Sequence, residues 1–370
     1  MIPVLYEANT TDFTNNGLGL LTDALSCTVS EELNGLFELT MTYPMDGIHA
    51  DEIAANCIIR AEPREEADVF EPFRIYRITR NINGILTIYA QHATYQMNYI
   101  PCMPIASASR TAAAALTAIK DAASETCPIN FSTDITTTKE FSLKEPTAMR
   151  SVIGGKEGSF LDIYGGEILW SWPNVQILQS RGSDSGMSIE YGRNMTSLLN
   201  DDSMAGVITG ICPFCRTHDS DNNELILTLS QKTIESDYAS VFPFRRTAAV
   251  DLTDKFSDVE GTVTEQQLFD AACEYVDANA VGVPRVSLEV GFFNARHDMG
   301  YTLVDKVTTL ALGDTVTVRF PLLNLVTKEK VVKAVYNVLL ERYDSITVGR
   351  LQQDLATTIN NIQLGNEVLI

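Results

Sequence analysis

One short run of sequence constrains the fold more than any other part of this chain. Residues 158–172 are Gly-Ser-Phe-Leu-Asp-Ile-Tyr-Gly-Gly-Glu-Ile-Leu-Trp-Ser-Trp. Ser159 and Asp162 have the spacing of a helix start, in which each side chain satisfies a free backbone N–H group. About one helical turn follows, and it ends at Gly165 and Gly166 because glycine tolerates a left-handed backbone. The alternating apolar residues after the glycines predict a strand with one buried face. This run is therefore architecture and not a site of chemistry.

Two Asn-Gly pairs divide residues 1–99 into hairpins. Asn34-Gly35 and Asn83-Gly84 each stand between runs of alternating apolar and polar residues. Such a pair supplies the two positive-φ residues of a type I′ turn. The first predicted hairpin covers 25–43, and the second joins 73–82 to 85–89. The first hairpin places four apolar residues on one face: Phe37, Leu39, Met41 and Tyr43. Residues 1–99 are predicted to form a β-barrel.

Residues 100–185 change in character and predict a small α+β insert domain. Ser107 or Ser109 is a candidate cap for an alanine-rich helix that extends to Ala123. The Thr-rich stretch 133–138 predicts an extended segment, and a strand is expected from Trp170 to Leu178. Ser, Asp and Gly then accumulate at 181–186, which is the composition of a linker.

The second part of the chain, 186–349, repeats the plan of the first. A long hairpin is predicted at 188–215, a strand at 314–320, a polar loop at 327–330 and a final hairpin at 331–348. The first barrel has the same order of long hairpin, strand, loop and hairpin. This order predicts an internal duplication of one β-barrel.

Two helical segments accompany the second barrel. A helical insert is expected at about 231–300, where Thr264 and Gln267 have the spacing of a capping box. Residues 350–370 are expected to form a C-terminal helix with a narrow apolar stripe. The stripe fits a coiled-coil seam as well as a flat docking site, and its assembly residues are Leu351, Leu355 and Ile359. The predicted fold class is α+β, mostly β, with two related barrels, two inserts and a terminal helix.

Size and charge exclude several functional classes. The chain has 370 residues, 45% of them apolar, which is enough for two to four folded domains. Its formal charge of −21 argues against nucleic-acid binding, because binding needs clustered Lys and Arg. Acidic pore walls would let DNA slide past, although acidity also simply maintains solubility. No apolar run is long enough for a membrane helix, and the N-terminus does not resemble a secretory signal.

The sequence predicts no catalytic residues and no cofactor. It has four histidines and no metalloprotease, serine-hydrolase or papain-like pattern. His92 stands at a strand end, where a structural hydrogen bond is the expected role. Glu157, Asp162 and Glu167 are close enough in sequence to suggest an acid pair, but Asp162 already has a capping role.

The seven cysteines do not form a disulfide framework, because their number is odd and they are scattered. One local cluster exists, made of Cys212, Cys215 and His218. As a zinc site it has three candidate ligands and no evident fourth, and as a redox motif it should open a helix but instead ends an apolar strand. We interpret it as two thiols packed at the end of a strand, and no metal is expected.

Four passages in the same order resemble one family. The run 158–172 resembles a hallmark of phage and prophage tail hub proteins, also called minor structural or tail-associated lysin proteins and often "prophage tail endopeptidase". Residues 73–98 resemble that family's first tube-domain hairpin, and 200–208 the opening of its second tube domain. Residues 312–349 resemble its closing strands. The resemblance therefore covers nearly the whole chain.

The resemblance implies a function in assembly. In this family three chains each give two tube domains, so that six similar barrels form a ring that matches a hexameric tail tube. The implied partners are the tail-tube and distal tail proteins, the tape-measure protein, and a tail fibre or spike. DNA would pass through the pore without specific binding, and this chain would not insert into a membrane. The expected location is the tail tip of the virion, after assembly in the bacterial host cytoplasm.

Two other functions remain open at this stage. Enzymatic domains of the family follow the hub region, and this sequence ends at Ile370, so a lysin module is expected to be absent. A tail-associated cell-wall endopeptidase would need a site that the sequence does not contain. A host-receptor-binding tail protein would use exposed aromatic residues on the insert.

Overall fold

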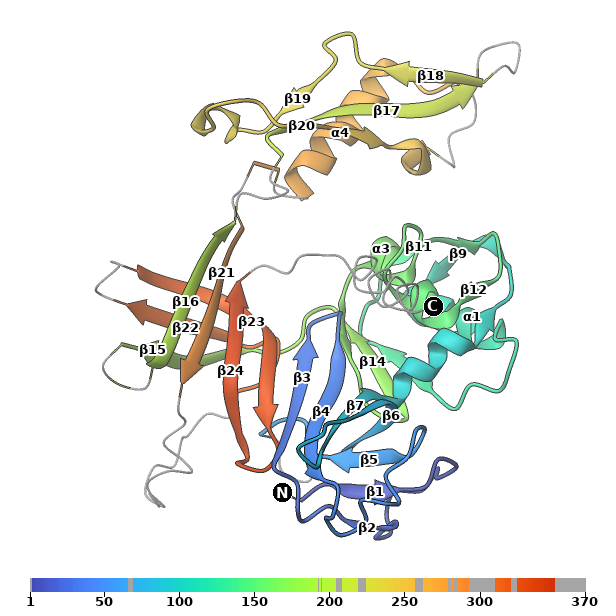
Figure 1. Ribbon diagram of the computed structural model, residues 1–370. Helices are drawn as coiled ribbons and strands as arrows, with labels where there is room; N and C mark the ends of the chain where they lie inside the picture. The colour runs from blue at the N-terminus through green and yellow to red at the C-terminus, as the bar shows by residue number, and fades with distance from the viewer. Residues whose placement is uncertain are drawn as a thin grey trace. The chain divides into compact units, whose positions relative to one another are not determined.

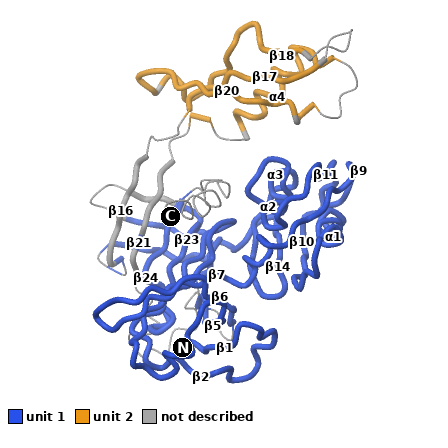
Figure 2. The backbone as a smooth tube through the Cα atoms, turned by 45° about the vertical axis from the view of Figure 1, so that its right-hand side comes forward, with its two compact units in different colours: residues 1–199, 288–370 blue, residues 200–287 orange. Residues whose placement is uncertain are grey.

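The computed structural model divides the chain into two compact units (Figure 2). The first contains residues 1–199 and 288–370, and the second contains 200–287. The structure describes residues 2–65, 69–191, 193, 195–203, 208–218, 224–256, 262–278, 281–282, 285–292, 310–320 and 325–349. The predicted fold class, α+β and mostly β, is confirmed. Within the described part of the chain, no helix has the length and apolar character that a membrane span requires.

One large sheet runs through the first unit (Figure 1). Its strands from the first part of the chain are β1 (Val4–Tyr6), β2 (Gly19–Leu20), β3 (Ser26–Glu32), β4 (Phe37–Pro44), β5 (Ile58–Ala61), β6 (Glu71–Arg80) and β7 (Ile85–His92). Its later strands are β15 (Asp184–Glu190), β16 (Met195–Ser203), β21 (Arg285–Phe292), β22 (Thr315–Phe320), β23 (Leu325–Asn337) and β24 (Arg342–Gly349). Both barrels predicted from the sequence therefore belong to one continuous sheet.

The two halves of this sheet have the same strand order. The first half runs β1-β5-β6-β7-β4-β3, and the second runs β15-β22-β23-β24-β21-β16. The halves differ at one end, because β1 is antiparallel to β5 whereas β15 is parallel to β22. The shared order supports the internal duplication. The halves meet where β23 pairs with β3.

The long hairpin expected at 188–215 does not form. Its first strand, β16, pairs instead with β21, and residues 204–284 lie between these two strands in the sequence. The residues expected to return, β17 (Gly210–His218), pair with β18 (Glu224–Thr228), β19 (Ile234–Glu235) and β20 (Thr247–Asp251). An alternating pattern indicates a strand but does not select its partner. The polar loop expected at 327–330 is also strand, because these residues pair with β22.

The two Asn-Gly connections are not type I′ turns. Asn34 has a φ of 57° but Gly35 is not left-handed, whereas Gly84 has a φ of 79° and Asn83 is not left-handed. The Glu32 N–H donates to the Leu36 carbonyl and the Asn81 N–H to the Ile85 carbonyl, so three residues remain in each loop, 33–35 and 82–84. A connection of this length needs only one left-handed residue, while the two-residue type I′ loop needs two. The predicted hairpins themselves are confirmed.

One large hydrophobic core extends through the first unit, beside a small group of Val4, Tyr6 and Ile58. It contains the predicted face of the first hairpin, Phe37, Leu39, Met41 and Tyr43, all fully buried. The same cluster continues through the insert and into the second half of the sheet, where Val316, Val331 and Tyr336 are buried. The first barrel, the insert and the second half are therefore packed together.

The insert follows β7 through the 3-10 helix η1 (Ala93–Tyr99). Its remaining elements are β8 (Pro101–Cys102), β9 (Ile105–Thr111), α1 (Ala112–Asp121), β10 (Asn130–Thr133), β11 (Thr138–Leu143), β12 (Thr147–Ala148), α2 (Met149–Ile153), α3 (Phe160–Tyr164), β13 (Glu167–Leu169) and β14 (Asn174–Leu178). Thr111 caps α1 in place of the expected Ser107 or Ser109, because those serines lie in β9, which pairs with β11. The strand expected from Trp170 to Leu178 is shorter, because Pro173 has no N–H to donate to a strand ladder, and β14 begins at Asn174.

The second unit packs one helix against a small sheet. It also contains the short helices η2 (Ala239–Val241) and η3 (Thr253–Phe256). Helix α4 (Glu265–Ala278) buries Leu268, Ala272 and Val276 in a cluster with residues of β17. Thr264 and Gln267 form the predicted capping box, with Thr264 N–H donating to Gln267 Oε1 over 2.9 Å. This unit spans 200–287, so its bounds differ from the 231–300 expected for the helical insert.

Candidate assembly site

The run at 158–172 forms the predicted cap and then joins two domains. Ser159 Oγ accepts a hydrogen bond from the Asp162 N–H over 3.4 Å, and Asp162 accepts one from the Gly158 N–H over 2.8 Å. The capping role of Asp162 is thus confirmed. Trp170 is buried in the core that the insert shares with the first barrel.

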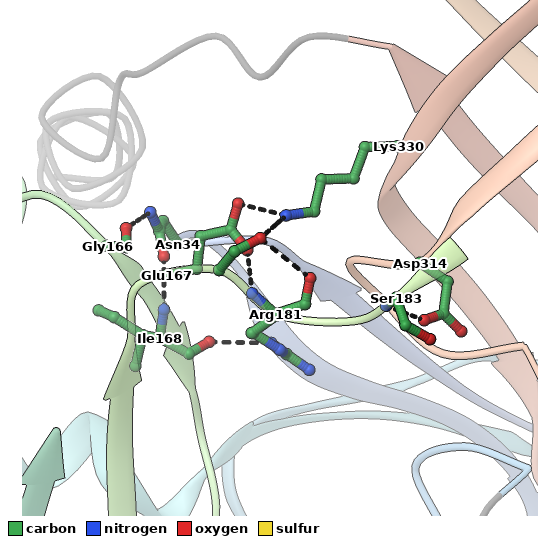
Figure 3. A network of polar contacts seen from close by, with 9 residues as sticks. Asn34, Gly166, Glu167, Ile168, Arg181, Ser183, Asp314 and Lys330 are labelled. Atoms are coloured by element: carbon green, nitrogen blue, oxygen red, sulfur yellow. Dashed lines mark hydrogen bonds and ion pairs between the residues drawn. The ribbon is translucent and has the colours of Figure 1, made fainter. Parts of the chain in front are cut away.

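Glu167 connects the insert to the second half of the sheet (Figure 3). Its two carboxylate oxygens lie 2.6 and 2.7 Å from Lys330 Nζ on β23. The backbone N–H of Arg181 donates to the same carboxylate over 2.5 Å. The side chains of Glu167 and Lys330 are only 18% and 25% exposed, so this ion pair is well shielded from water. Glu167 therefore acts as a connector and does not form an acid pair with Asp162.

Arg181 makes a second, more deeply buried connection. Its guanidinium donates to Glu31 Oε1 on β3 over 2.9 Å and to the Ile168 carbonyl oxygen over 2.8 Å. Glu31 also lies 3.7 Å from Arg64. A buried ion pair is stable only when its remaining hydrogen-bonding groups also find partners. Here the Ile168 carbonyl provides such a partner for the Arg181 guanidinium. This site holds the first barrel, the insert and the linker together.

The turn after β3 is attached to the insert on both sides of the Asn34 amide. Asn34 Nδ2 donates to the Gly166 carbonyl over 3.0 Å, and its Oδ1 accepts from the Ile168 N–H over 2.7 Å (Figure 3). The linker is fixed in turn, because the Ser183 N–H donates to Asp314 Oδ1 over 2.7 Å. These contacts fix the insert over the end of β3.

A buried arginine strengthens the same contact. The guanidinium of Arg150 on α2 lies 3.9 Å from the ring centre of Tyr95 and 4.2 Å from that of Trp170. It also donates to the Gly35 carbonyl over 3.2 Å. Burial lowers the pKa of Arg150 from its usual value, and the two aromatic faces provide favourable contacts for the cation.

His92 has the structural role expected of it. Its Nε2 lies 3.0 Å from Glu71 Oε2 and its Nδ1 lies 2.8 Å from Thr94 Oγ1. The ring is fully buried and stacks on Phe37 at 4.5 Å between centres. Glu71 Oε2 also accepts from the Trp172 N–H over 2.8 Å, which ties this core to the insert.

The structure does not bring the two thiols of the Cys212 cluster together. The pairing of β17 with β20 is regular from Gly210 to Phe214, and Cys215 follows in register with β18. Residues three apart on a regular strand face opposite sides of the sheet. Cys215 is buried against α4, where burial raises its pKa, while Cys212 is half-buried. The structure does not describe the side chain of His218. Among the residues that the structure describes, no three His, Cys, Asp or Glu side chains form a metal-binding group.

Equivalent strands of the two halves have different edges. The second half of β23 pairs with β3 from Lys333–Glu32 to Asn337–Thr28, and Lys333 Nζ lies 2.8 Å from Glu32 Oε1. Its equivalent, β6, pairs on that side only through residues 71–75, with β5 and with Asn56 and Cys57 just before it. Among the described residues, 77–80 of β6 pair with β7 and no other strand. The other end of the sheet is β16, which has β21 as its neighbour.

The exposed edge of β6 was not identified from the sequence. The residues expected to mediate assembly, Leu351, Leu355 and Ile359, lie outside the described part of the chain. The sequence of the exposed half of β6, 76–80, is Tyr-Arg-Ile-Thr-Arg. Charged residues on a strand are a known signal of an edge, and the two arginines here are such a signal.

Comparisons with solved structures show which proteins share this fold, whereas no family model and no curated protein matches the chain. The prophage tail protein gp18 from Listeria monocytogenes has a TM-score of 0.60 at 14% identity, covering 98% of this chain and 99% of that one. A tail protein from Neisseria meningitidis has a TM-score of 0.59 at 8% identity, with 96% and 98% covered. The 43 kDa tail protein of prophage MuSo2 from Shewanella oneidensis has a TM-score of 0.57 at 9% identity, with 96% and 100% covered. The resemblance inferred from the sequence is thus confirmed at the level of the fold, and this chain has the fold of prophage tail proteins over nearly its whole length.

Proposed function

We propose that this chain is a structural hub protein of a phage or prophage-derived tail. Three copies would form a ring at the distal end of the tail, close the tail tube and carry the distal fibre or spike. The fold that the chain shares with prophage tail proteins supports a place in a tail. The observation that carries the ring proposal is the pairing of β23 with β3 inside one chain.

This internal junction provides a template for a junction between chains. In the duplicated order, β6 corresponds to β23 and β16 corresponds to β3. The exposed half of β6 in one chain therefore pairs with β16 of the next chain, as β23 pairs with β3. Covering exposed strand edges is a general requirement in sheet proteins. Because the same contact repeats within and between chains, a closed ring results when the rotation closes.

Three chains, the number that the family resemblance implies, give a ring of suitable size. Each chain contributes eight strands to the ring, counted from β16 to β6 with both included, so that three chains contribute 24. At about 4.8 Å per strand the ring has a circumference of about 115 Å and a diameter of about 37 Å. Barrels of 16–18 strands already leave an aqueous channel, so this ring has an open pore. With −21 charges per chain the pore lets DNA pass without specific binding.

The proposed role is mechanical and not enzymatic. The side chains that the sequence offered for catalysis have structural partners: Asp162 caps α3, Glu167 binds Lys330, and His92 binds Glu71. The partners of the chain are the tail-tube and distal tail proteins, the tape-measure protein and the fibre or spike. The location is the tail tip of the virion.

Charge reversal on the exposed edge tests the ring directly. The sequence of β16 contains Asp201 and Asp202, so Arg77→Glu with Arg80→Glu places like charges at the proposed junction. We expect wild-type protein to sediment as a trimer and to form three-fold rings in negative-stain images. The double variant should remain monomeric with an unchanged melting temperature.

Two exposed arginines of the second unit provide the matched control. Arg216→Glu with Arg245→Glu makes the same charge change on residues of the second unit that belong to neither β6 nor β16, and should leave the trimer intact. Wild-type protein that stays monomeric at high concentration and forms no ring with its tail tubes would refute the proposal. Zymography on cell-wall substrate addresses the alternative, since clearing by the pure protein would show a hydrolase.

A further inference from the structure

The two rims of the large sheet differ in what they carry. One rim contains the turn after β3, which is covered by the insert through Asn34 and Arg150. The insert itself follows the end of β7 at this rim. In the duplicated half, the connection that corresponds to the β3–β4 turn is the one between β16 and β21, where the second unit is inserted in the chain. The insert and the second unit are thus both added at connections of the same kind, those at the end of the sheet where the β3–β4 turn lies.

The opposite rim, here called the free rim, is identified by the strand registers. It contains the start of β3 and the end of β4, because Ser26 pairs with Thr42. It also contains the β6–β7 turn, 81–84, and the β23–β24 turn, 338–341, because Asn337 pairs with both Thr28 and Arg342. No inserted domain follows any of these connections.

Exposed apolar side chains mark the free rim. Ile82 at the tip of the β6–β7 turn is fully exposed, and Leu340 at the tip of the β23–β24 turn is 54% exposed. Between these tips stand Leu25, just before β3, and Met45, just after β4, both exposed. In an acidic chain these side chains form an apolar line along one edge of the sheet. The two tips occupy equivalent positions in the duplicated halves.

The spacing of the tips identifies the symmetry of the partner. In the order β24-β23-β3-β4-β7-β6, the centres of the two turns are four strands apart, which is about 19 Å. If the next chain joins at β6, its first tip again lies four strands further on. The tips then repeat evenly, two per chain, as six equal contacts. A three-fold partner would need only one apolar tip per chain.

We propose that the free rim is the docking face for the end of the tail tube, a six-fold ring that offers one apolar socket to each tip. This inference rests on the proposed function, and it adds to it the direction in which the hub faces. Ile82 and Leu340 insert into equivalent sockets, while Leu25 and Met45 cover the tube between them. The insert and the second unit belong to the connections that do not dock the tube.

The test uses the full-length chain and tail tubes purified from particles that lack this chain. Ile82→Asp with Leu340→Asp places a charge on both tips without disturbing buried residues. We expect the melting temperature and the mass of the assembled ring to remain those of the wild type. The concentration that caps half of the tube ends, counted in electron micrographs, should rise by at least about tenfold.

Two control variants make the result specific. Leu225→Asp with Ile226→Asp introduces the same charges on exposed residues of β18 in the second unit, and should cap tubes normally. Ile82→Leu with Leu340→Met keeps the tips apolar and should also cap normally. Normal capping by the Asp tip variant overturns the inference, as does an equal loss in the β18 control. A wild-type chain that forms no ring contradicts the proposed function instead, since capping is scored only on assembled rings.

Discussion

The two halves of the large sheet share one strand order but differ at corresponding edges. In the second half, β23 is long enough to pair with β22 through 325–330 and with β3 through 333–337. Its side chain Tyr336 is 1% exposed. In the first half, β6 has a described partner only along 71–75 on that side, and Tyr76 is 49% exposed. The difference shows that the strands of one half do not cover the edge of that half. The edge of β23 is covered by β3, which belongs to the other half.

The same halves also differ at their long hairpins. The connection between β3 and β4 is a loop of three residues, 33–35, closed by the bond from the Glu32 N–H to the Leu36 carbonyl, whereas the corresponding connection between β16 and β21 contains the second unit. Loops tolerate such insertions because closing a longer loop costs little additional entropy. The barrel plan therefore tolerates additions at this connection while the strand order is maintained.

The largest difference between the halves is expected for the two tyrosines. Tyr336→Ala removes a buried ring that packs edge-on against Tyr343 at 5.3 Å, and should lower the free energy of unfolding by about 4 kcal/mol. Tyr76→Ala on the exposed edge should change it by less than about 0.5 kcal/mol. Urea unfolding followed by tryptophan fluorescence measures both, since Trp170 and Trp172 lie in the first unit. Equal losses would mean that the two edges are not different in the isolated chain.

The buried connector between the first barrel, the insert and the linker should be nearly as sensitive. Arg181→Ala leaves Glu31 buried with Arg64 at 3.7 Å as its nearest remaining cation, and should cost about 3 kcal/mol. Arg245→Ala removes an exposed ion pair with Glu235 and should cost less than about 1 kcal/mol. The same urea experiment applies to Arg181→Ala, and thermal melting of the second unit applies to the control. If both variants lose under 1 kcal/mol, the connector does not hold the insert and the linker to the first barrel.

The two asparagines of the Asn-Gly turns provide a smaller comparison. Asn34→Gly retains the left-handed backbone but removes the hydrogen bonds to Gly166 and Ile168, and should cost about 1–2 kcal/mol. Asn83→Gly removes an exposed bond to the Ile85 N–H, which water replaces, and should cost less than about 0.5 kcal/mol. Chemical denaturation of both variants measures the difference. A larger loss for Asn83→Gly would show that the insert does not depend on the β3 turn.

The ion pair at the closed edge should have the smallest effect. Lys333 and Glu32 are 40% and 30% exposed, so Lys333→Ala should cost about 0.2–1 kcal/mol at low salt. The cost should disappear in 1 M salt, where charges are screened beyond about 3 Å. Melting curves at two salt concentrations test this. A loss that persists in high salt would indicate that backbone pairing at the junction, and not charge, had been disturbed.

Several local features of this protein were determined by the sequence alone. The alternation from Phe37 to Tyr43 predicted the buried face of β4, and the Ser159–Asp162 and Thr264–Gln267 spacings predicted two helix caps. These features depend on contacts between residues within a few positions of each other, so a short stretch of sequence is enough to predict them. The resemblance of four passages likewise predicted the fold shared with prophage tail proteins.

Only the tertiary structure decided which strands and side chains meet. It paired β16 with β21 across a whole unit, joined β23 to β3, left β6 exposed, and brought Glu167 to Lys330. It also placed Cys212 and Cys215 on opposite faces of β17, although they are close in sequence. A strand offers the same backbone groups to any neighbour, so its partner is selected by distant packing and register. That selection depends on the whole first unit, and no local pattern contains it.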